Sequence, residues 1–169
     1  MNTSFFILFK GDIIMGQIET RLKELGITLP EVGEPKFSYI PSRRTGNLVY
    51  TSGMDCRVDG VLIHEGKVGS DLTIEQGQEA ARQCIINALA VIKKEIGSLD
   101  KVKQVVKMLA FVNSAPGFGD QPYVINGGSN LLIEVFGDAG RHARSAIGTS
   151  DLPFHTPVEI EIIVEVADE

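Results

Sequence analysis

The stretch from residue 73 to residue 97 restricts the fold of this chain more than any other. Thr73 is followed three positions later by Gln76, which is the capping-box pattern that begins a helix. Apolar residues then recur every three or four positions until Gly97, where the helix is expected to end. These residues are Ala81, Ile85, Ala88, Ile92 and Ile96. A long helix with one apolar stripe must cover a second layer, which we expect to be a β-sheet.

Strand and helix patterns alternate through the rest of the chain. An Asp59-Gly60 pair between valines predicts a tight hairpin, and a short helix is expected at 18–25, before Gly26. Strands are expected at 48–53, 102–113, 142–148 and 158–166, and a second long helix at 120–137. This order predicts an α+β protein in which a mixed β-sheet carries two helices on one face. The other face would be bare, and a bare apolar face commonly drives oligomerisation.

The second long helix contains an unfavourable Asn126-Gly127-Gly128 sequence. Each glycine disfavours a helix by about 1 kcal/mol relative to alanine. We therefore expect close packing or a nearby ligand at this point of the helix.

The chain length and the N-terminal sequence indicate one domain. With 169 residues, the chain suits a single domain with a short extension. The apolar run at 5–9 is too short to span a membrane, and it lacks the basic leader and cleavage site of a signal peptide. We expect 15–169 to form the domain, with Met15 as the natural first residue and 1–14 as an upstream extension.

Charge, cysteine and histidine content argue against several protein classes. The net charge is −6, and the Lys and Arg residues are scattered rather than gathered in a basic stripe. Cys56 and Cys84 are too few for a disulfide framework, so we expect apolar fillers in a reduced, cytoplasmic protein. The three histidines show no metal-ligand spacing. We therefore expect no metal, nucleic-acid or membrane partner.

Two pairs of polar residues near the C-terminus are candidates for chemistry. In a strand at 142–148, His142 and Arg144 share one face, because side chains alternate, and Glu159 and Glu161 share a face of the last strand. One interpretation is a solvated polar face or a structural ion pair. The other is an Arg that grips a substrate carboxylate beside a Glu that handles a proton or a water molecule. Periodicity alone does not decide between the two.

The end of the chain resembles the closing signature of the reactive-intermediate deaminase (Rid) family. That signature is an Ala-Arg-Ser sequence, here at 143–145, followed by Leu152-Pro153 and then by a Glu in an alternating apolar strand at 158–161. The resemblance extends over residues 37–167. It implies a homotrimer with a chorismate-mutase-like fold and with pockets between neighbouring subunits.

Upstream motifs resemble the same family in the same order. The strand that ends in Ser52-Gly53 matches the family's T-S-G strand, and Tyr39 lies at the usual distance before that serine. Asn126 falls where family members often place an Asn in the second helix. Several matches in the right order are more specific than any one of them.

The resemblance implies an enzyme that hydrolyses enamines and imines, such as 2-aminoacrylate, to 2-keto acids and ammonia. Arg144 would clamp the substrate carboxylate in a bidentate pair, while Glu159 would activate water and shuttle a proton. No metal or organic cofactor is implied. The residues expected to line the pocket are Tyr39, Ser52, Gly53, Asn126 and Ala146.

Ala146 departs from the family pattern, because many deaminating members have a Cys there. Together with the long N-terminal region and His142, this departure indicates a divergent branch whose substrate could differ from 2-aminoacrylate. The alternative hypothesis is a binding module that senses a small carboxylate without turnover. An older label for the family, endoribonuclease, is less favoured, because RNA binding depends on neutralising phosphates.

Overall fold

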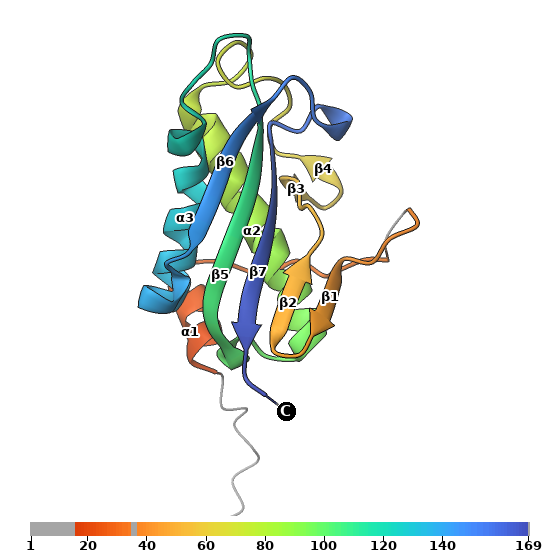
Figure 1. The fold of residues 1–169 in the computed structure, drawn as a ribbon, viewed down its shortest axis with the longest axis vertical. Coiled ribbons are helices and arrows are strands. Elements are labelled where there is room, and N and C mark those ends of the chain that lie inside the picture. The colour runs from red at the N-terminus through yellow and green to blue at the C-terminus, as the bar shows by residue number, and fades with distance from the viewer. Residues whose placement is uncertain (1–15, 35–36, 169) are drawn as a thin grey trace, which may run out of the picture.

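Five β-strands form one mixed sheet, and two long helices pack on one face of it (Figure 1). The computed structural model describes residues 16–34 and 37–168, so the expected extension at 1–14 lies outside the described residues. The strands lie in the order β1-β2-β7-β5-β6; β5 and β6 run parallel, and the other neighbours are antiparallel. Their bounds are β1 Ser42–Thr45, β2 Leu48–Thr51, β5 Val102–Asn113, β6 Ala143–Thr149 and β7 Val158–Val166. The predicted α+β fold is confirmed.

Helix α2 spans Ile74–Ile96 and begins with the capping box expected from the sequence. Gln76 N donates to Thr73 Oγ1 over 3.2 Å, and Thr73 N donates to Gln76 Oε1 over 2.9 Å. These bonds satisfy backbone amides that have no partner inside the helix. Gly97, with a φ of 83°, follows the last helical residue, as predicted.

Helix α3 spans Gln121–Phe136 and lies against α2, and its two central glycines allow this contact. A Cβ atom added to Gly127 would overlap the backbone carbonyl oxygen of Gln78, and one added to Gly128 would press on Ile85. The close packing expected here is therefore confirmed. It accounts for two residues of poor helix propensity in the middle of a helix.

The shorter elements also follow the sequence pattern. Helix α1 spans Gln17–Glu24 and is followed by Gly26 at a φ of 69°. Asp59 and Gly60, with φ of 51° and 84°, form the two-residue turn of the predicted hairpin, because this turn type needs positive φ at both positions. The hairpin strands are β3 Arg57–Val58 and β4 Val61–Leu62, and the 3-10 helices are η1 Leu99–Lys101, η2 Gly137–Gly140 and η3 Pro153–His155.

The two faces of the sheet differ in character. Side chains such as Met108, Ile160 and Ile162 point toward the helices and are fully buried in the core. The opposite face, called the open face below, mixes apolar and charged side chains, and no helix of the described residues covers it (Figure 1). Its residues include Tyr50, Lys107, Phe111, Ser145, Ile147, Glu159 and Glu161. No helix in the described part of the chain is both long enough and apolar enough to cross a membrane.

Candidate active site in two parts

Arg144 is held at the edge of the sheet by helix α3. It lies on β6, opposite the buried Met108 of β5, and its side chain therefore points to the helix-covered face. Arg144 Nη1 donates to Ser129 Oγ and Nη2 donates to the backbone oxygen of Pro122, both over 3.0 Å. A guanidinium carries five N–H donors, so three remain for a ligand after these two bonds. The group is thus oriented without being saturated.

Asn126 and Ala146 lie beside Arg144. Pro122, Asn126 and Ser129 are four and three residues apart on α3 and so share one face of the helix. Ala146 lies two residues after Arg144 on β6 and points to the same side of the sheet. The structure therefore brings together three of the residues predicted for the site. We call the group of Asn126, Ser129, His142, Arg144 and Ala146 the arginine half-site.

His142 joins this half-site through Ser129. The strand predicted from residue 142 begins one residue later, at Ala143, so His142 directly precedes β6. Its Nε2 lies 3.0 Å from Ser129 Oγ, and its Nδ1 lies 2.7 Å from the backbone oxygen of Gly140. Burial lowers the pKa of His142. The hydrogen bond to Gly140 offsets part of this effect, and the charge of Arg144 lowers the pKa by a smaller amount. The prediction that His142 and Arg144 share a face is confirmed, since both contact Ser129.

Glu159 lies on the open face of β7, directly over the backbone of Gly53. A Cβ atom added to Gly53 would overlap Glu159 Oε1, so only glycine fits beneath the carboxylate in this position. Burial raises the pKa of Glu159, and the charge of Glu161, two residues along the same strand face, raises it further. Glu159 forms no hydrogen bond or ion pair with any other described residue. We call Glu159, Glu161, Gly53 and Ser52 the glutamate half-site.

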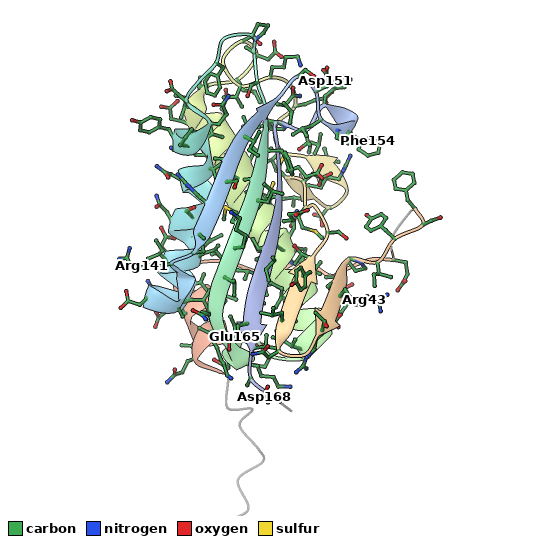
Figure 2. All side chains as sticks on the ribbon, in the orientation of Figure 1. Arg43, Arg141, Asp151, Phe154, Glu165 and Asp168 are labelled. Carbon is green, nitrogen blue, oxygen red and sulfur yellow. The ribbon has the colours of Figure 1, made fainter. Side chains whose placement is uncertain are left out.

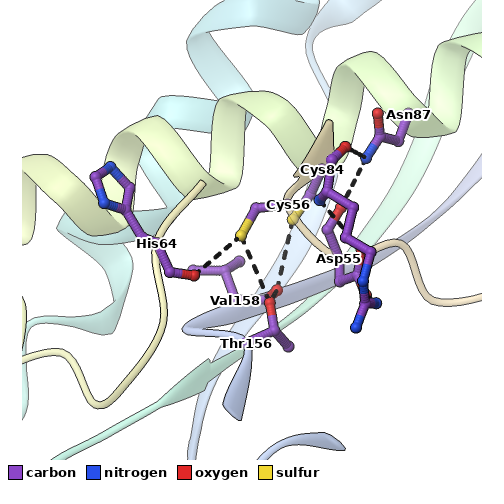
Figure 3. Close-up of polar contacts among 8 residues, drawn as sticks. Asp55, Cys56, His64, Cys84, Asn87, Thr156 and Val158 are labelled. Carbon is purple, nitrogen blue, oxygen red and sulfur yellow. Dashed lines mark hydrogen bonds and ion pairs between the residues drawn. The ribbon is translucent and has the colours of Figure 1, made fainter. Parts of the chain in front are cut away.

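Polar contacts to α2 hold the segment that follows Gly53 (Figure 3). Asn87 Nδ2 donates to the backbone oxygens of Asp55 and Arg57, each over 2.9 Å. Asp55 also forms an ion pair with Arg57, whose guanidinium lies 4.8 Å from the centre of the Phe154 ring. The segment that follows Gly53 is therefore fixed to α2.

The two cysteines belong to this support. Cys56 Sγ lies 3.7 Å from Thr156 Oγ1, and Cys84 Sγ donates to the backbone oxygen of Val158 over 3.5 Å (Figure 3). Both side chains are fully buried, and burial raises the pKa of Cys84 well above its ordinary value. A buried thiol of raised pKa is unreactive. The prediction that both cysteines are fillers is confirmed, and no group of His, Cys, Asp and Glu in the described chain could hold a metal ion.

Within the glutamate half-site, Ser52 holds the segment that leads into the edge strand β1 and carries Tyr39. Ser52 Oγ donates to the backbone oxygen of Ile40 over 2.7 Å, and Ser52 N donates to that of Pro41 over 2.8 Å. Ser52 therefore ties down the segment that carries Tyr39. The Tyr39 side chain is 49% exposed, so it is available to a partner or a ligand.

Within one chain, the structure does not bring Arg144 and Glu159 together. Arg144 is paired with Met108 on the helix-covered face, whereas Glu159 is paired with Phe111 on the open face. Figure 2 shows the side chains on the ribbon, with Arg141 at the side of the molecule formed by α3 and β6 and Glu165 on β7. Within one chain the two residues are therefore not neighbours, and the predicted Arg beside a Glu requires a pocket between subunits, which stays a prediction. A sheet places residues of opposite parity on opposite faces.

Sequence reasoning missed two features of the site. Ser129, which accepts a hydrogen bond from Arg144, was detectable only through its helical spacing from Asn126. Phe154 and His155 have φ of 58° and 60°, a left-handed conformation that costs energy in residues other than glycine. No glycine or asparagine marks this turn, so the sequence offered no signal for it.

Comparisons with known proteins agree on one family. The model described as "YjgF/chorismate mutase-like, putative endoribonuclease" matches residues 19–166. Protein TCP17 of Trypanosoma cruzi is 39% identical over 155 residues, which are 91% of this chain and 97% of that protein. The crystal structure of Atu1372 from Agrobacterium tumefaciens, a protein of unknown function, has a TM-score of 0.83 and 45% identity and covers 89% of this chain and 92% of its own. A 2-iminobutanoate/2-iminopropanoate deaminase of Dermatophagoides farinae is 29% identical over 143 residues, which are 83% of this chain and 94% of that protein.

Proposed function

This chain belongs to the YjgF/chorismate mutase-like family, and we propose that it hydrolyses small 2-imino acids to 2-keto acids and ammonia. The observation that carries the proposal is the glutamate half-site: a carboxyl group of raised pKa, free of protein partners among the described residues, over a glycine. A general base works best when its pKa lies near the working pH. Similarity to a 2-iminobutanoate/2-iminopropanoate deaminase supports the substrate class.

The arginine half-site supplies the complementary function. Arg144 keeps three N–H donors for a carboxylate, and a planar guanidinium binds a carboxylate through two parallel hydrogen bonds. Asn126 and the backbone near Ala146 would complete the contacts to the substrate, with Tyr39 shaping the rim. Because the two half-sites lie on opposite faces of one chain, we propose a homotrimer in which the arginine half-site of one subunit faces the glutamate half-site of its neighbour.

The reaction then needs a correctly oriented imine and water molecule and a group, Glu159, that carries a proton between them. Arg144 holds the carboxylate of the imine, and Glu159 takes a proton from water as the water oxygen bonds to C2. The C=N electron pair moves onto the nitrogen, which receives that proton back from Glu159. The resulting tetrahedral carbinolamine passes its hydroxyl proton through Glu159 to the amine. The C2–N bond breaks, ammonia leaves, and the C=O bond of the 2-keto acid forms. Holding water and imine together reduces the entropic part of the barrier, so no cofactor is needed.

The charges of the site disfavour RNA as a substrate. The reactive part of the open face carries two carboxyl groups, Glu159 and Glu161, which repel phosphates. The net charge of −6 acts in the same direction.

A coupled assay tests the proposal. A PLP-dependent threonine dehydratase releases 2-iminobutanoate, and semicarbazide traps what remains of it. We expect the wild-type protein to suppress formation of the semicarbazone, and Arg144→Ala to lose at least about 100-fold of this activity, because a charged binding group is removed. Arg141→Ala is the matched control, since Arg141 is an exposed arginine that pairs only with Asp138 among the described residues.

Two results would contradict the proposal. Equal activity of Arg144→Ala and wild type would remove Arg144 from the site. No suppression by wild-type protein, together with a rise in its melting temperature on adding 2-oxobutanoate, would favour a module that binds small carboxylates without turnover. Sedimentation equilibrium of the same samples tests the homotrimer.

A further inference from the structure

We propose that Ser129 and His142 are positioning residues, which hold the Arg144 guanidinium in the orientation that receives its ligand. This inference rests on the proposed function only in taking that ligand to be a carboxylate. Neither side chain would touch the substrate. Both would act through Arg144.

The hydrogen bonds around Ser129 form a chain in which each group donates to the next, from Arg144 to Ser129 to His142 to Gly140. The backbone oxygen of Gly140 can only accept, so His142 Nδ1, at 2.7 Å, must carry a proton and donate it. In the neutral imidazole, Nε2 is then an acceptor, and the Ser129 hydroxyl donates to it over 3.0 Å. The lone pairs of Ser129 Oγ are left to accept from Arg144 Nη1, also at 3.0 Å. The chain from Arg144 to Gly140 is therefore satisfied at every step.

The surroundings keep His142 neutral, which the chain requires. Arg144 is the charged group closest to His142 in this network, and no carboxylate is paired with the imidazole among the described residues. Arg141, next to His142 in sequence, pairs with Asp138. On the elements packed against it, Glu134 of α3 pairs with Arg82, and Lys107 of β5 donates to Ser145 on the open face. Burial lowers the pKa of His142 by more than the Gly140 hydrogen bond raises it, and Arg144 adds to the lowering. The imidazole is therefore neutral at pH 7, and its Nε2 can accept.

Fixing Arg144 in advance has a functional consequence. A free arginine side chain samples many rotamers, and binding a ligand must then select one of them. Ser129 is 8% exposed on a packed helix, so it offers a rigid acceptor, and His142 directs the hydroxyl proton away from the guanidinium. Preorganised binding groups give tighter binding because less freedom is lost on association.

The first experiment reads the imidazole directly and needs no ligand. Long-range proton–nitrogen NMR of the wild-type protein, labelled in histidine, should show His142 as the neutral Nδ1–H form at pH 7. In Arg144→Met the His142 pKa should rise, because the neighbouring charge is gone. The chemical shifts of His64, which pairs with Glu79 on another part of the surface, should stay the same at pH 7 and serve as the control. An Nε2–H tautomer, or a protonated His142 at pH 7, would overturn the inference whatever the protein catalyses.

The second experiment separates binding from turnover. In the coupled assay, Ser129→Ala and His142→Ala should raise KM for the imine about five- to tenfold, the factor expected for one lost hydrogen bond, with kcat within about twofold. His142→Gln should restore most of the affinity, because the Gln oxygen can accept from Ser129. His64→Ala is the matched control and should behave as wild type. Unchanged KM in both alanine variants, or a fall confined to kcat, would contradict a positioning role.

Failure of the proposed function is distinguishable from failure of this inference. If the wild-type protein turns over no imine, calorimetric titration with 2-oxobutanoate replaces KM, and the same ranking of dissociation constants is expected. If the wild type neither reacts with the imine nor binds 2-oxobutanoate, the proposed function is wrong, and the NMR result alone decides whether the hydrogen-bond chain exists. A folded His142→Ala that binds as tightly as wild type would leave the function standing and would refute the positioning role.

Discussion

The two half-sites are built on opposite principles. In the arginine half-site, helix α3 supplies hydrogen bonds that orient Arg144, and Ser129 and His142 both have hydrogen-bond partners. In the glutamate half-site, Glu159 is brought over Gly53 without a partner among the described residues, and a second carboxylate lies nearby. Hydrogen bonds from the protein fix the direction of a binding group. Partial burial without a partner instead raises the pKa of a carboxyl group, so that it can exchange a proton near neutral pH. The first half-site should therefore govern affinity, and the second should govern turnover.

Replacing Glu159 should give the largest effect and tests whether the glutamate half-site governs turnover. Glu159→Gln keeps the shape of the side chain but cannot accept a proton, so kcat in the coupled assay should fall by about 100- to 10,000-fold, with KM within a few-fold of wild type. Glu165→Gln is the matched control, because Glu165 lies on the same face of the same strand. If Glu159→Gln raised KM and spared kcat, the assignment of roles to the two half-sites would have to be exchanged.

Gly53 offers a milder test of the glutamate half-site. In Gly53→Ala the new methyl group takes the place of Glu159 Oε1, so the carboxylate must move while its charge is retained. Displacing a catalytic group by about 1 Å can cost on the order of 100-fold in rate. The coupled assay should show this loss in kcat, whereas Gly33→Ala, where nothing lies near the added atom, should retain full activity. Full activity in Gly53→Ala would show that the position of Glu159 is not critical.

Much of this architecture was predictable, because it depends on local patterns. The capping box at Thr73, the Asp59-Gly60 turn and the alternation in β7 each need only neighbouring residues to be recognised. The close packing at Gly127 was likewise inferred from the cost of glycine in a helix. These features are repeated in the structure nearly to the residue.

The relation between the half-sites was not predictable in the same way. Which face Arg144 takes relative to Glu159 depends on how β6 and β7 pair with β5, where Met108 lies opposite Arg144 and Phe111 lies opposite Glu159. Pairing between strands that are distant in the sequence is not specified by the alternation within any one of them. Ser129 was not predicted for a related reason: its role depends on how α3 packs against β6, which carries Arg144.

Gly127 affects the arginine half-site indirectly, because it allows α3 to pack closely against α2. In Gly127→Ala the added methyl group would overlap the backbone oxygen of Gln78, so α3 must shift away from α2. Such overpacking should lower the free energy of unfolding by about 1–3 kcal/mol, measured by chemical denaturation. Because α3 carries the acceptors of Arg144, KM should rise as well. Gly119→Ala is the control, because a methyl group added there meets no atom within 4 Å. Equal stability of the two variants would mean that α2 and α3 are not in close contact at Gly127.

The smallest expected effect is a pH-dependent gain of stability in Glu159→Gln. The pKa of Glu159 is raised in the folded protein, so the folded state holds that proton more tightly than the unfolded chain does. The resulting loss of stability is complete above the raised pKa and disappears as the pH falls below the ordinary pKa of a glutamic acid. Glu159→Gln lacks this penalty. Its melting temperature should exceed that of wild type at pH 7.5, and the two should converge near pH 4.

The same measurement can reveal whether the half-sites meet. Within one chain Arg144 and Glu159 lie on opposite faces, so their effects on stability should be additive. If a neighbouring subunit's arginine faces Glu159, its charge offsets part of the penalty, and the gain from Glu159→Gln at pH 7.5 should be larger in an Arg144→Ala background. An equal gain in both backgrounds, with Glu165→Gln unchanged between them, would mean that the two half-sites stay apart in the assembled protein.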